Sequence, residues 1–233
     1  MKTFIKENIP GAKFLWRKLY NFYKKHIYSK NTSLVFQDKF RNNAWGSSES
    51  ISGLGSELRQ TQNLLTEMPL IFEKYKIKNI IDLPCGDFNW FRFLNYKFDS
   101  YIGADIVEEL IELNNKKYGE FGKFIKLNLL KDRLPAANLI LCRDCLVHFS
   151  YNDIRRAIKN IKKSNIEYIL TTTYISREVN GDILTGNWRP LNLQLSPFSF
   201  PEPIEIIIEN SQEANGTRLD KALAMWRIKD LTI

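Results

Sequence analysis

Several patterns that mark common classes of protein are missing from this sequence. The chain has only two histidines and no cluster of histidines near its three cysteines, so neither a zinc site nor a disulfide framework is supported. We expect no metal. No run of 18 uncharged apolar residues exists, and no signal-peptide core stands at the N-terminus. These absences predict a protein that neither spans a membrane nor is secreted, and its cysteines fit the reducing cytoplasm.

Acidic residues are scarce in the first 30 positions. These positions hold eight Lys or Arg residues and one acid, Glu7, a net +7 of the chain's +8, which leaves about +1 for the rest. Apolar and aromatic residues recur at helical spacing over 12–27 and predict a basic amphipathic helix. Three interpretations stay open for this N-terminal arm (1–35): packing on the domain, peripheral contact with an anionic membrane or a lipid-linked precursor, or nucleic-acid binding. Nucleic acid is not favoured, because the remaining domain (36–233) is nearly neutral.

Two short apolar runs that each end in an acid organise that domain. The first, KNIIDLPCGDFNW at 78–90, predicts a strand to Asp82, a tight Pro-Cys-Gly turn and a helix after Asp87. The second, YIGADIV at 101–107, ends in Asp105, 23 positions after Asp82. A βαβ nucleotide-binding unit places a ribose-binding carboxylate at about this offset.

These two segments resemble motif I and its acidic partner in the class I S-adenosylmethionine-dependent methyltransferases, whose first loop reads acid-x-Gly-x-Gly-x-Gly. Pro84 and Phe88 replace the first and third glycines here, and only Gly86 is kept. A dinucleotide needs those glycines for its pyrophosphate, whereas a methyl donor carries no phosphate. The resemblance therefore implies S-adenosyl-L-methionine as cofactor. It implies cofactor contacts at the motifs and the following strand ends: Asp82, Pro84, Cys85, Gly86, Asp105, Ile106, Asn128, Leu129 and Arg143.

Alternating strand and helix patterns predict the remaining fold. Helices are expected at 56–76, where Pro69 should kink or divide the helix, and at 107–118 and 151–163. Further strands are expected at 124–130, from 138 into a loop ending at 150, and at 168–174, 203–209 and 222–229. These elements predict a doubly wound, Rossmann-like sheet of seven strands, α/β in class, mostly parallel with the last strand antiparallel.

Two irregular segments have more than one interpretation. Residues 36–56 are rich in Ser and Gly and read either as a plain linker or, from the resemblance, as a segment that meets the methionine end through Trp45, Ser52, Gly53 and Ser56. Residues 180–203 are too long for an ordinary loop, and their aromatic residues predict an ordered lid.

The loop after the fourth predicted strand carries the candidate chemistry. His148 is either a catalytic base or a structural residue, and Asp144 either positions substrate or the cofactor's ammonium, caps a helix, or pairs with Arg143. Asn128 either meets the adenine or forms a turn at the strand end. Tyr174, Trp188 and Arg189 are candidates on the substrate side.

The predicted function is methyl transfer to a small polar acceptor. In character the loops resemble those of methyltransferases found with bacterial surface-polysaccharide enzymes, which implies a hydroxyl or phosphoryl oxygen of a sugar or glycan precursor as the acceptor. A nicotinamide-dependent reductase or epimerase, or a cofactor-binding partner without catalysis, are the alternatives. No oligomeric state is predicted.

Overall fold

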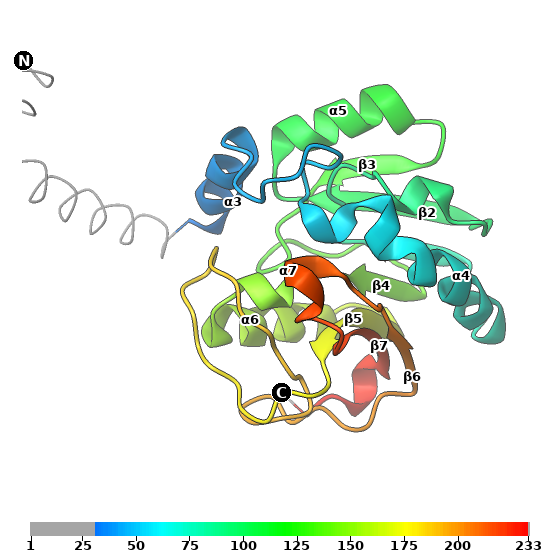
Figure 1. Cartoon of the computed structure of the whole chain (residues 1–233). Helices are drawn as coiled ribbons and strands as arrows, with labels where there is room; N and C mark the ends of the chain where they lie inside the picture. The colour runs from blue at the N-terminus through cyan, green and yellow to red at the C-terminus, as the bar shows by residue number, and fades with distance from the viewer. Residues whose placement is uncertain (1–30, 233) are drawn as a thin grey trace, which may run out of the picture.

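Seven strands form one sheet in the order β3-β2-β1-β4-β5-β7-β6 in the computed structural model, which describes residues 31–232 (Figure 1). The strands are β1 (Asn79–Asp82), β2 (Ser100–Asp105), β3 (Lys123–Lys126), β4 (Leu139–Cys142), β5 (Tyr168–Tyr174), β6 (Glu205–Ile208) and β7 (Lys221–Arg227). Strand β7 pairs antiparallel with both β5 and β6, while the other pairs are parallel. The predicted sheet, with its antiparallel last strand, is confirmed. The strand order reverses between β1 and β4, where ligands of open α/β sheets bind.

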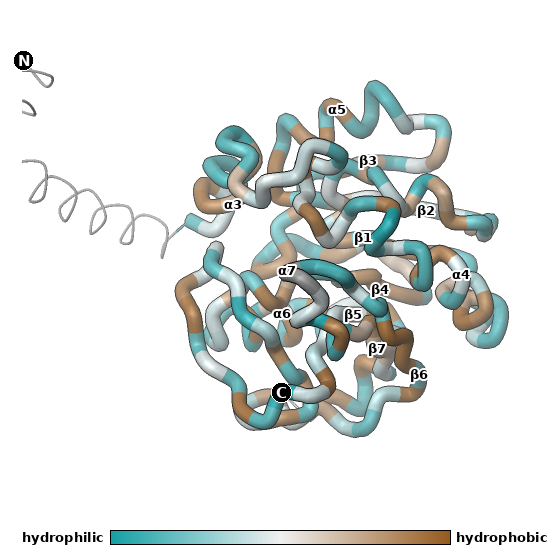
Figure 2. The backbone as a smooth tube through the Cα atoms, viewed as in Figure 1, coloured by the Kyte–Doolittle hydropathy of each residue, from teal (hydrophilic) through white to brown (hydrophobic). Residues whose placement is uncertain are grey.

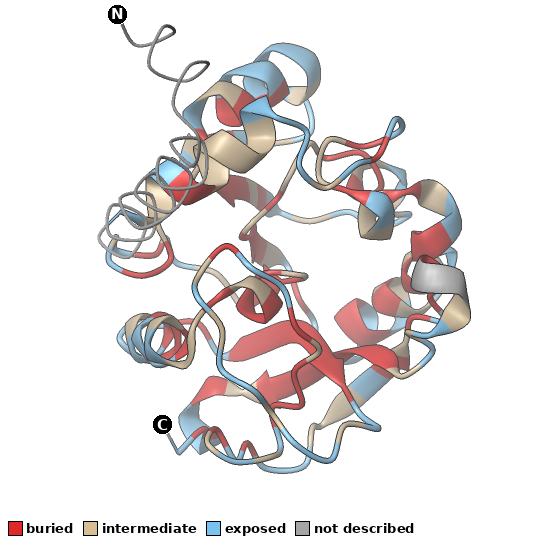
Figure 3. Cartoon of the chain, turned by 60° about the vertical axis from the view of Figure 1, so that its left-hand side comes forward, coloured by how far each residue is buried: buried red, intermediate tan, exposed pale blue. Residues whose placement is uncertain are grey.

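Helices cover both faces of this sheet. The α-helices are α3 (Thr32–Arg41), α4 (Leu58–Lys74), α5 (Glu108–Tyr118), α6 (Tyr151–Lys162) and α7 (Glu213–Gly216). Short 3₁₀ helices are η1 (Leu54–Ser56), η2 (Phe91–Phe93), η3 (Leu146–His148) and η4 (Ile228–Asp230). Side chains alternate between the two faces, so Ile80 packs in the same layer as α4 and α5, and Ile81 in the same layer as α6. A sheet covered on both sides needs buried strands, and every residue of β4 and β5 and all but the last residue of β7 are buried. Figure 2 shows hydrophobic stretches at β4 and β7, and Figure 3 shows buried strands in the middle of the molecule.

Helices α6 and α4 form where apolar residues recur at helical spacing, as predicted. Ser150 caps α6 by accepting a hydrogen bond from the backbone N–H of Asp153, and apolar residues three and four apart then bury one face of that helix. Helix α4 buries Met68 and Phe72 in the opposite layer. Pro69 lies inside α4, which continues to Lys74, so the proline does not divide the helix.

The expected helix after Asp87 is absent. Between β1 and β2 the chain forms turns and the three-residue η2, and five side chains fill the space against the sheet, which we call the aromatic plug: Phe88, Trp90, Phe91, Tyr96 and Phe98. Phe88 has φ of 57°, outside the helical region, and its ring centroid lies 5.2 Å from those of Tyr101 and Phe124. Aromatic residues lose rotamer freedom in a helix, which disfavours helix formation. In this stretch the packing of the rings against one another takes the place of a helix.

The predicted loop at 36–56 begins as helix. Asn31 caps α3 by accepting from the backbone N–H of Leu34 at 3.4 Å, and α3 crosses the expected domain boundary between residues 35 and 36. Val35 is buried and the Phe36 ring lies 6.0 Å from that of Phe149, so α3 packs on the domain. The basic helix predicted at 12–27 lies outside the described residues.

Residues 180–203 are ordered, as predicted, but pack on the sheet. Leu191, Leu193, Phe198 and Phe200 are buried in the layer that contains α6, and the ring of Phe200 packs against that of Trp226 on β7. The segment contributes no residue to the cavity described below. Within residues 31–232, no helix is long and apolar enough to cross a membrane.

Candidate active site

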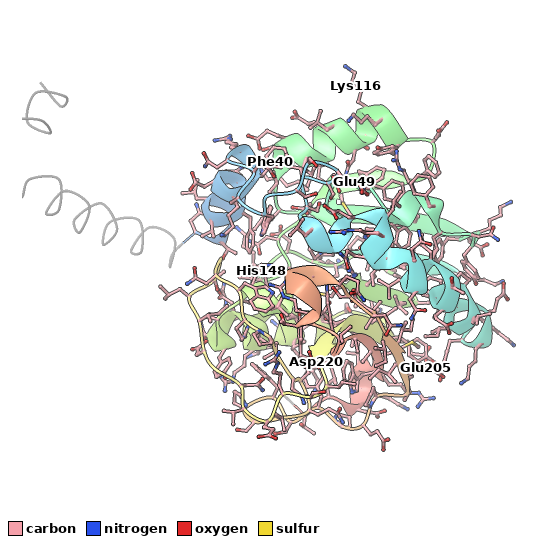
Figure 4. The ribbon with its side chains drawn as sticks, in the orientation of Figure 1. Phe40, Glu49, Lys116, His148, Glu205 and Asp220 are labelled. Atoms are coloured by element: carbon pink, nitrogen blue, oxygen red, sulfur yellow. The ribbon has the colours of Figure 1, made fainter. Side chains whose placement is uncertain are left out.

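A cavity lies at the carboxyl ends of β1, β2 and β4, and the segment that joins α3 to α4 forms part of its wall. Figure 4 places Phe40 of α3 and His148 of η3 on the same side of the molecule, and both line this cavity. It is also lined by nearly all the residues predicted from the sequence: Trp45, Ser52, Ser56, Asp82, Pro84, Cys85, Gly86, Asp105, Ile106, Asn128, Leu129, Arg143, Asp144 and His148. Four predicted residues do not line it: Gly53 and the substrate-side candidates Tyr174, Trp188 and Arg189.

The loop after β1 has a backbone that requires glycine. Gly86 has φ of 55°, and an added Cβ would overlap Ser52 Oγ. Its N–H points to Asp105 Oδ2 at 3.4 Å, and its carbonyl accepts from the Asn114 amide at 2.7 Å. This one glycine lets the segment before α4 approach the loop closely.

Two buried carboxyls face the cavity from neighbouring strand ends. Asp82 accepts a hydrogen bond from the Tyr101 hydroxyl at 2.9 Å, and burial raises the pKa of Asp82 to about 8. Asp105 accepts from the Val107 N–H at 3.0 Å; burial raises the pKa of Asp105 to about 6, although backbone hydrogen bonds oppose the shift. A ligand that brings hydroxyl or ammonium donors to such buried carboxyls would stabilise their ionised form.

Asp87 ties the outer wall of the cavity to the β1 loop. Its carboxylate accepts from the hydroxyls of Ser50 and Ser52 and from the Ile51 N–H, at 2.9 to 3.0 Å. Its own N–H donates to Ser52 Oγ at 2.9 Å. Gly53, with φ of 101°, supports the turn behind Trp45 and has no place on the wall.

Asn128 lies in a turn beyond β3, which ends two residues earlier than Asn128. Its Oδ1 accepts from the Leu130 N–H at 2.9 Å, as expected of a turn former, while the residue also lines the cavity. The adenine and turn interpretations are therefore compatible.

His148 lies at the wall with one ring nitrogen engaged. Nδ1 is 2.9 Å from the Asn187 carbonyl, which can only accept, so Nδ1 carries the proton and Nε2 of the neutral ring holds a lone pair. Burial lowers the pKa of His148, although the Asn187 hydrogen bond and the Asp144 charge oppose the shift. Trp45 packs beside it, with ring centroids 6.3 Å apart. His148 thus has the tautomer of a proton acceptor.

The residues predicted on the substrate side make their contacts within the fold and do not line the cavity. The Arg189 guanidinium is buried and donates to the carbonyls of Leu146, Val147 and Phe149 at 2.9 to 3.1 Å, so it holds the η3 loop in place. Tyr174 is buried, and burial raises the pKa of its hydroxyl. Tyr174 packs against Trp188 outside the cavity wall.

Asp144 and Arg143 join an ion cluster that the sequence did not reveal. Arg143 Nη2 donates to Glu209 Oε2 at 2.6 Å and to the Gly55 carbonyl at 2.8 Å. Lys221 Nζ donates to Asp144 Oδ2 at 2.7 Å and to Glu213 Oε1 at 3.1 Å. Burial alone would raise the pKa of Asp144, but the charges of Lys221 and Arg143 hold it well below its usual range.

All three cysteines are free and buried. Cys142 and Cys145 stand at C-x-x-C spacing, and Cys145 lines the cavity. No group of three His, Cys, Asp or Glu residues in the described part of the chain has the arrangement of a metal site.

Comparison with known proteins identifies solved structures that share this fold. No family model matches the chain, and no curated protein sequence matches it. Among solved structures, the N-methyltransferase NodS from Bradyrhizobium japonicum, in complex with S-adenosyl-L-homocysteine, is 12% identical with a TM-score of 0.58, and the match covers 82% of this chain and 97% of NodS. Magnesium protoporphyrin IX methyltransferase ChlM from Synechocystis, with bound S-adenosylmethionine, is 11% identical with a TM-score of 0.56, covering 84% of this chain and 97% of ChlM. A shorter match spans 66% of the methyltransferase domain of bacterial CtHen1 and 49% of this chain, with a TM-score of 0.44. The chain therefore has the Rossmann-like fold of NodS and ChlM.

Proposed function

We propose that this protein is an S-adenosylmethionine-dependent methyltransferase. The observation that carries the proposal is the pair of buried carboxyls, Asp82 and Asp105, at adjacent strand ends in one cavity. Asp105 suits ribose hydroxyls, because a carboxylate at the end of β2 can accept both protons. NodS and ChlM, which share the fold, were solved with the product and the methyl donor, respectively.

The charges of the cavity favour a cationic ligand. Asp105 and Asp144 line it as carboxylates near neutral pH, and Asp82 lines it as a carboxyl that burial keeps largely protonated there. Arg143 is the one lining Lys or Arg in the described chain, and it is already paired with Glu209. The β1 loop is followed by no α-helix, so it offers no helix N-terminus to a pyrophosphate. A nicotinamide dinucleotide would lack its usual anion site here, whereas a sulfonium and an ammonium would meet carboxyls.

Strand order gives the direction of the ligand in this proposal. With ribose at Asp105 on β2, the adenine lies toward Asn128 beyond β3 and the methionine arm lies over the β1 loop. The reactive end then points to β4, whose loop carries Asp144 and His148. The bound donor supplies an already activated methyl group. The chain's own task is to hold an acceptor oxygen in line and, for a hydroxyl, to take its proton at His148 Nε2.

We further propose that the acceptor is a hydroxyl or phosphoryl oxygen of a surface-polysaccharide sugar or its precursor. The likeness in loop character supports this acceptor, and so do the aromatic rings of Phe36, Phe40 and Trp45 at the cavity, since sugar rings pack on aromatic faces. The basic N-terminal arm (1–35) would bring the protein to the anionic inner face of the membrane, which suits a lipid-linked precursor.

Calorimetry with S-adenosylhomocysteine and with NADH, side by side, tests the cofactor. Binding of the first and not the second supports the proposal; the reverse would favour a reductase or epimerase of the same fold. Release of S-adenosylhomocysteine in the presence of glycan precursors separates an enzyme from a cofactor-binding partner without catalysis. Loss of a methyl group from the surface glycans of cells lacking the protein would identify the acceptor.

A further inference from the structure

Six charged side chains pack together beside the proposed reactive end of the cavity. This cluster, which we call the ion cluster, contains three cations and three carboxylates: Arg143, Lys221, Arg218, Asp144, Glu209 and Glu213. Its members come from the β4 loop, from the connection between β6 and β7, and from the first residue of β7. Segments about 70 residues apart in sequence thus meet at one edge of the sheet.

Lys221 is the centre of the ion cluster. It pairs with Tyr174 across the antiparallel β5–β7 ladder, which places it at the sheet edge next to the β4 loop. Its side chain is only 1% exposed, and its Nζ lies within 3.4 Å of Asp144, Glu209 and Glu213. A buried ammonium is expensive to desolvate, and apolar residues of similar size often stabilise a fold more. A contribution to folding stability alone therefore does not explain why a lysine is buried at position 221.

Asp144 connects the ion cluster to the cavity. Its side chain is 27% exposed and lines the cavity wall, whereas that of Glu209 is fully buried. Oδ2 is taken by Lys221 at 2.7 Å and lies 3.4 Å from Arg143 Nη1. Oδ1 has one long contact, 3.4 Å from Thr172 Oγ1. One oxygen of an ionised carboxylate is thus fixed by cations, and the other remains for a ligand.

We infer that Lys221 is a positioning residue, which holds the Asp144 carboxylate toward the cationic end of the methyl donor. The inference rests on the proposed function, and specifically on the β2-to-β4 direction of the ligand. Fixing Oδ2 against Lys221 restricts the rotation of the carboxylate before the ligand arrives, so its interaction with the positive charge that the bound donor already carries costs little reorganisation. Lys221 itself, being buried, touches no ligand.

The test compares two ligands that differ in charge at the reactive position. S-adenosylhomocysteine has a neutral sulfur there, and sinefungin has an amine that is protonated near neutral pH. We expect the parent protein to bind sinefungin more tightly, as measured by calorimetry. Asp144→Asn should lower that preference roughly ten-fold or more, because it removes a charged acceptor. Glu213→Gln with Lys221→Met removes one cation and one carboxylate together, so the cluster stays balanced, and should lower the preference as well.

The triple variant shows whether Lys221 acts through Asp144. If it does, adding Glu213→Gln and Lys221→Met to Asp144→Asn causes no further loss of preference; an additive loss overturns the inference. A matched control is Lys74→Met with Glu205→Gln, an ion pair between α4 and β6 outside the cavity, which should leave the preference unchanged. Should the balanced double variant fail to fold, Asp144→Asn alone decides, because an unchanged preference in that variant overturns the inference.

The outcomes for the parent protein separate the two levels of the argument. A parent that binds neither ligand contradicts the proposed methyltransferase function. A parent that binds both equally well keeps the proposed function and refutes the role assigned to Lys221 and Asp144.

Discussion

Asp105→Asn is the substitution that most directly tests the cofactor site. The Asp105 carboxyl accepts from the Val107 N–H at 3.0 Å through Oδ1, and an asparagine carbonyl can keep that hydrogen bond. Asparagine cannot accept two ribose hydroxyl protons with a negative charge. The variant therefore removes the proposed ligand contact while it preserves the turn after β2, which alanine would not do.

The expected loss follows from the character of the interaction. Hydrogen bonds to charged groups contribute about 1.5–3 kcal/mol, so affinity for S-adenosylhomocysteine should fall about ten- to a hundred-fold. A second signature is pH. Burial raises the pKa of Asp105 to about 6, so the carboxylate that accepts the hydroxyl protons is lost as pH falls through that value. Parent affinity should therefore decline below about pH 6, and this part of the decline should vanish in Asp105→Asn.

Calorimetric titration of both proteins with S-adenosylhomocysteine between pH 5 and 8 measures both effects. Asn63→Ala is a control, since the Asn63 amide bonds to the Ile208 carbonyl outside the cavity. Unchanged affinity in Asp105→Asn at pH 7.5, with the fold intact by circular dichroism, would refute the assignment of ribose to Asp105.

Three further outcomes are expected. Since the pKa of Asp82 is raised from 3.8 to about 8, the folded protein keeps a proton that the unfolded chain releases, and stability should fall as pH rises from about 4 to 8. Urea unfolding of Asp82→Asn should show a flatter pH profile and higher stability at pH 8, and a parent whose stability rises across this window would contradict the burial argument. His148→Ala should lower turnover about 10²–10⁴-fold with little change in S-adenosylhomocysteine affinity, and parent turnover should drop only below pH 6.5, because burial lowers the pKa of His148; turnover within a few-fold of the parent would make His148 structural. Removal of residues 1–30 should preserve cofactor affinity and abolish salt-sensitive binding to anionic vesicles, and full-length protein that ignores such vesicles at low salt would exclude the membrane role.

Local patterns predicted the strands, and the resemblance of the two acid-ended segments implied most of the residues that line the cavity. Asp82 and Asp105 each end an apolar run, and parallel strands bring their carboxyl ends to one edge, so proximity followed from the sequence. Of the two interpretations of the Ser/Gly-rich segment, the one that brings it to this edge fits better, because Trp45, Ser52 and Ser56 line the cavity. Its first residues form α3, with Asn31 as the cap. The prediction of a helix after Asp87 was wrong, because the packing of the rings of Phe88 and its neighbours outweighed the helical pattern.

The ion cluster could not be read from the sequence. Glu209, Glu213 and Lys221 lie in no motif, and a lysine within an apolar run such as β7 gives no sign of which carboxylates will surround it. Only the β5–β7 register, which pairs Lys221 with Tyr174, brings it beside Asp144. Sites that depend on antiparallel register across distant segments need the structure.

The aromatic plug between β1 and β2 has tightly packed side chains but few hydrogen-bonded backbone amides, although these two features usually occur together. In a helix, buried side chains and protected amides come together, because the same turns supply packing and i to i−4 hydrogen bonds. Here the rings of Phe88 and Phe91 are held on several sides, yet few backbone hydrogen bonds span residues 88–98, namely those from the amides of Phe88, Phe93, Leu94 and Tyr96. Amide hydrogens in this stretch should therefore exchange with solvent much faster than those of α4 beside it, while its rings flip slowly. The loop between the strands that end in Asp82 and Asp105 would look mobile to hydrogen exchange and rigid to side-chain NMR.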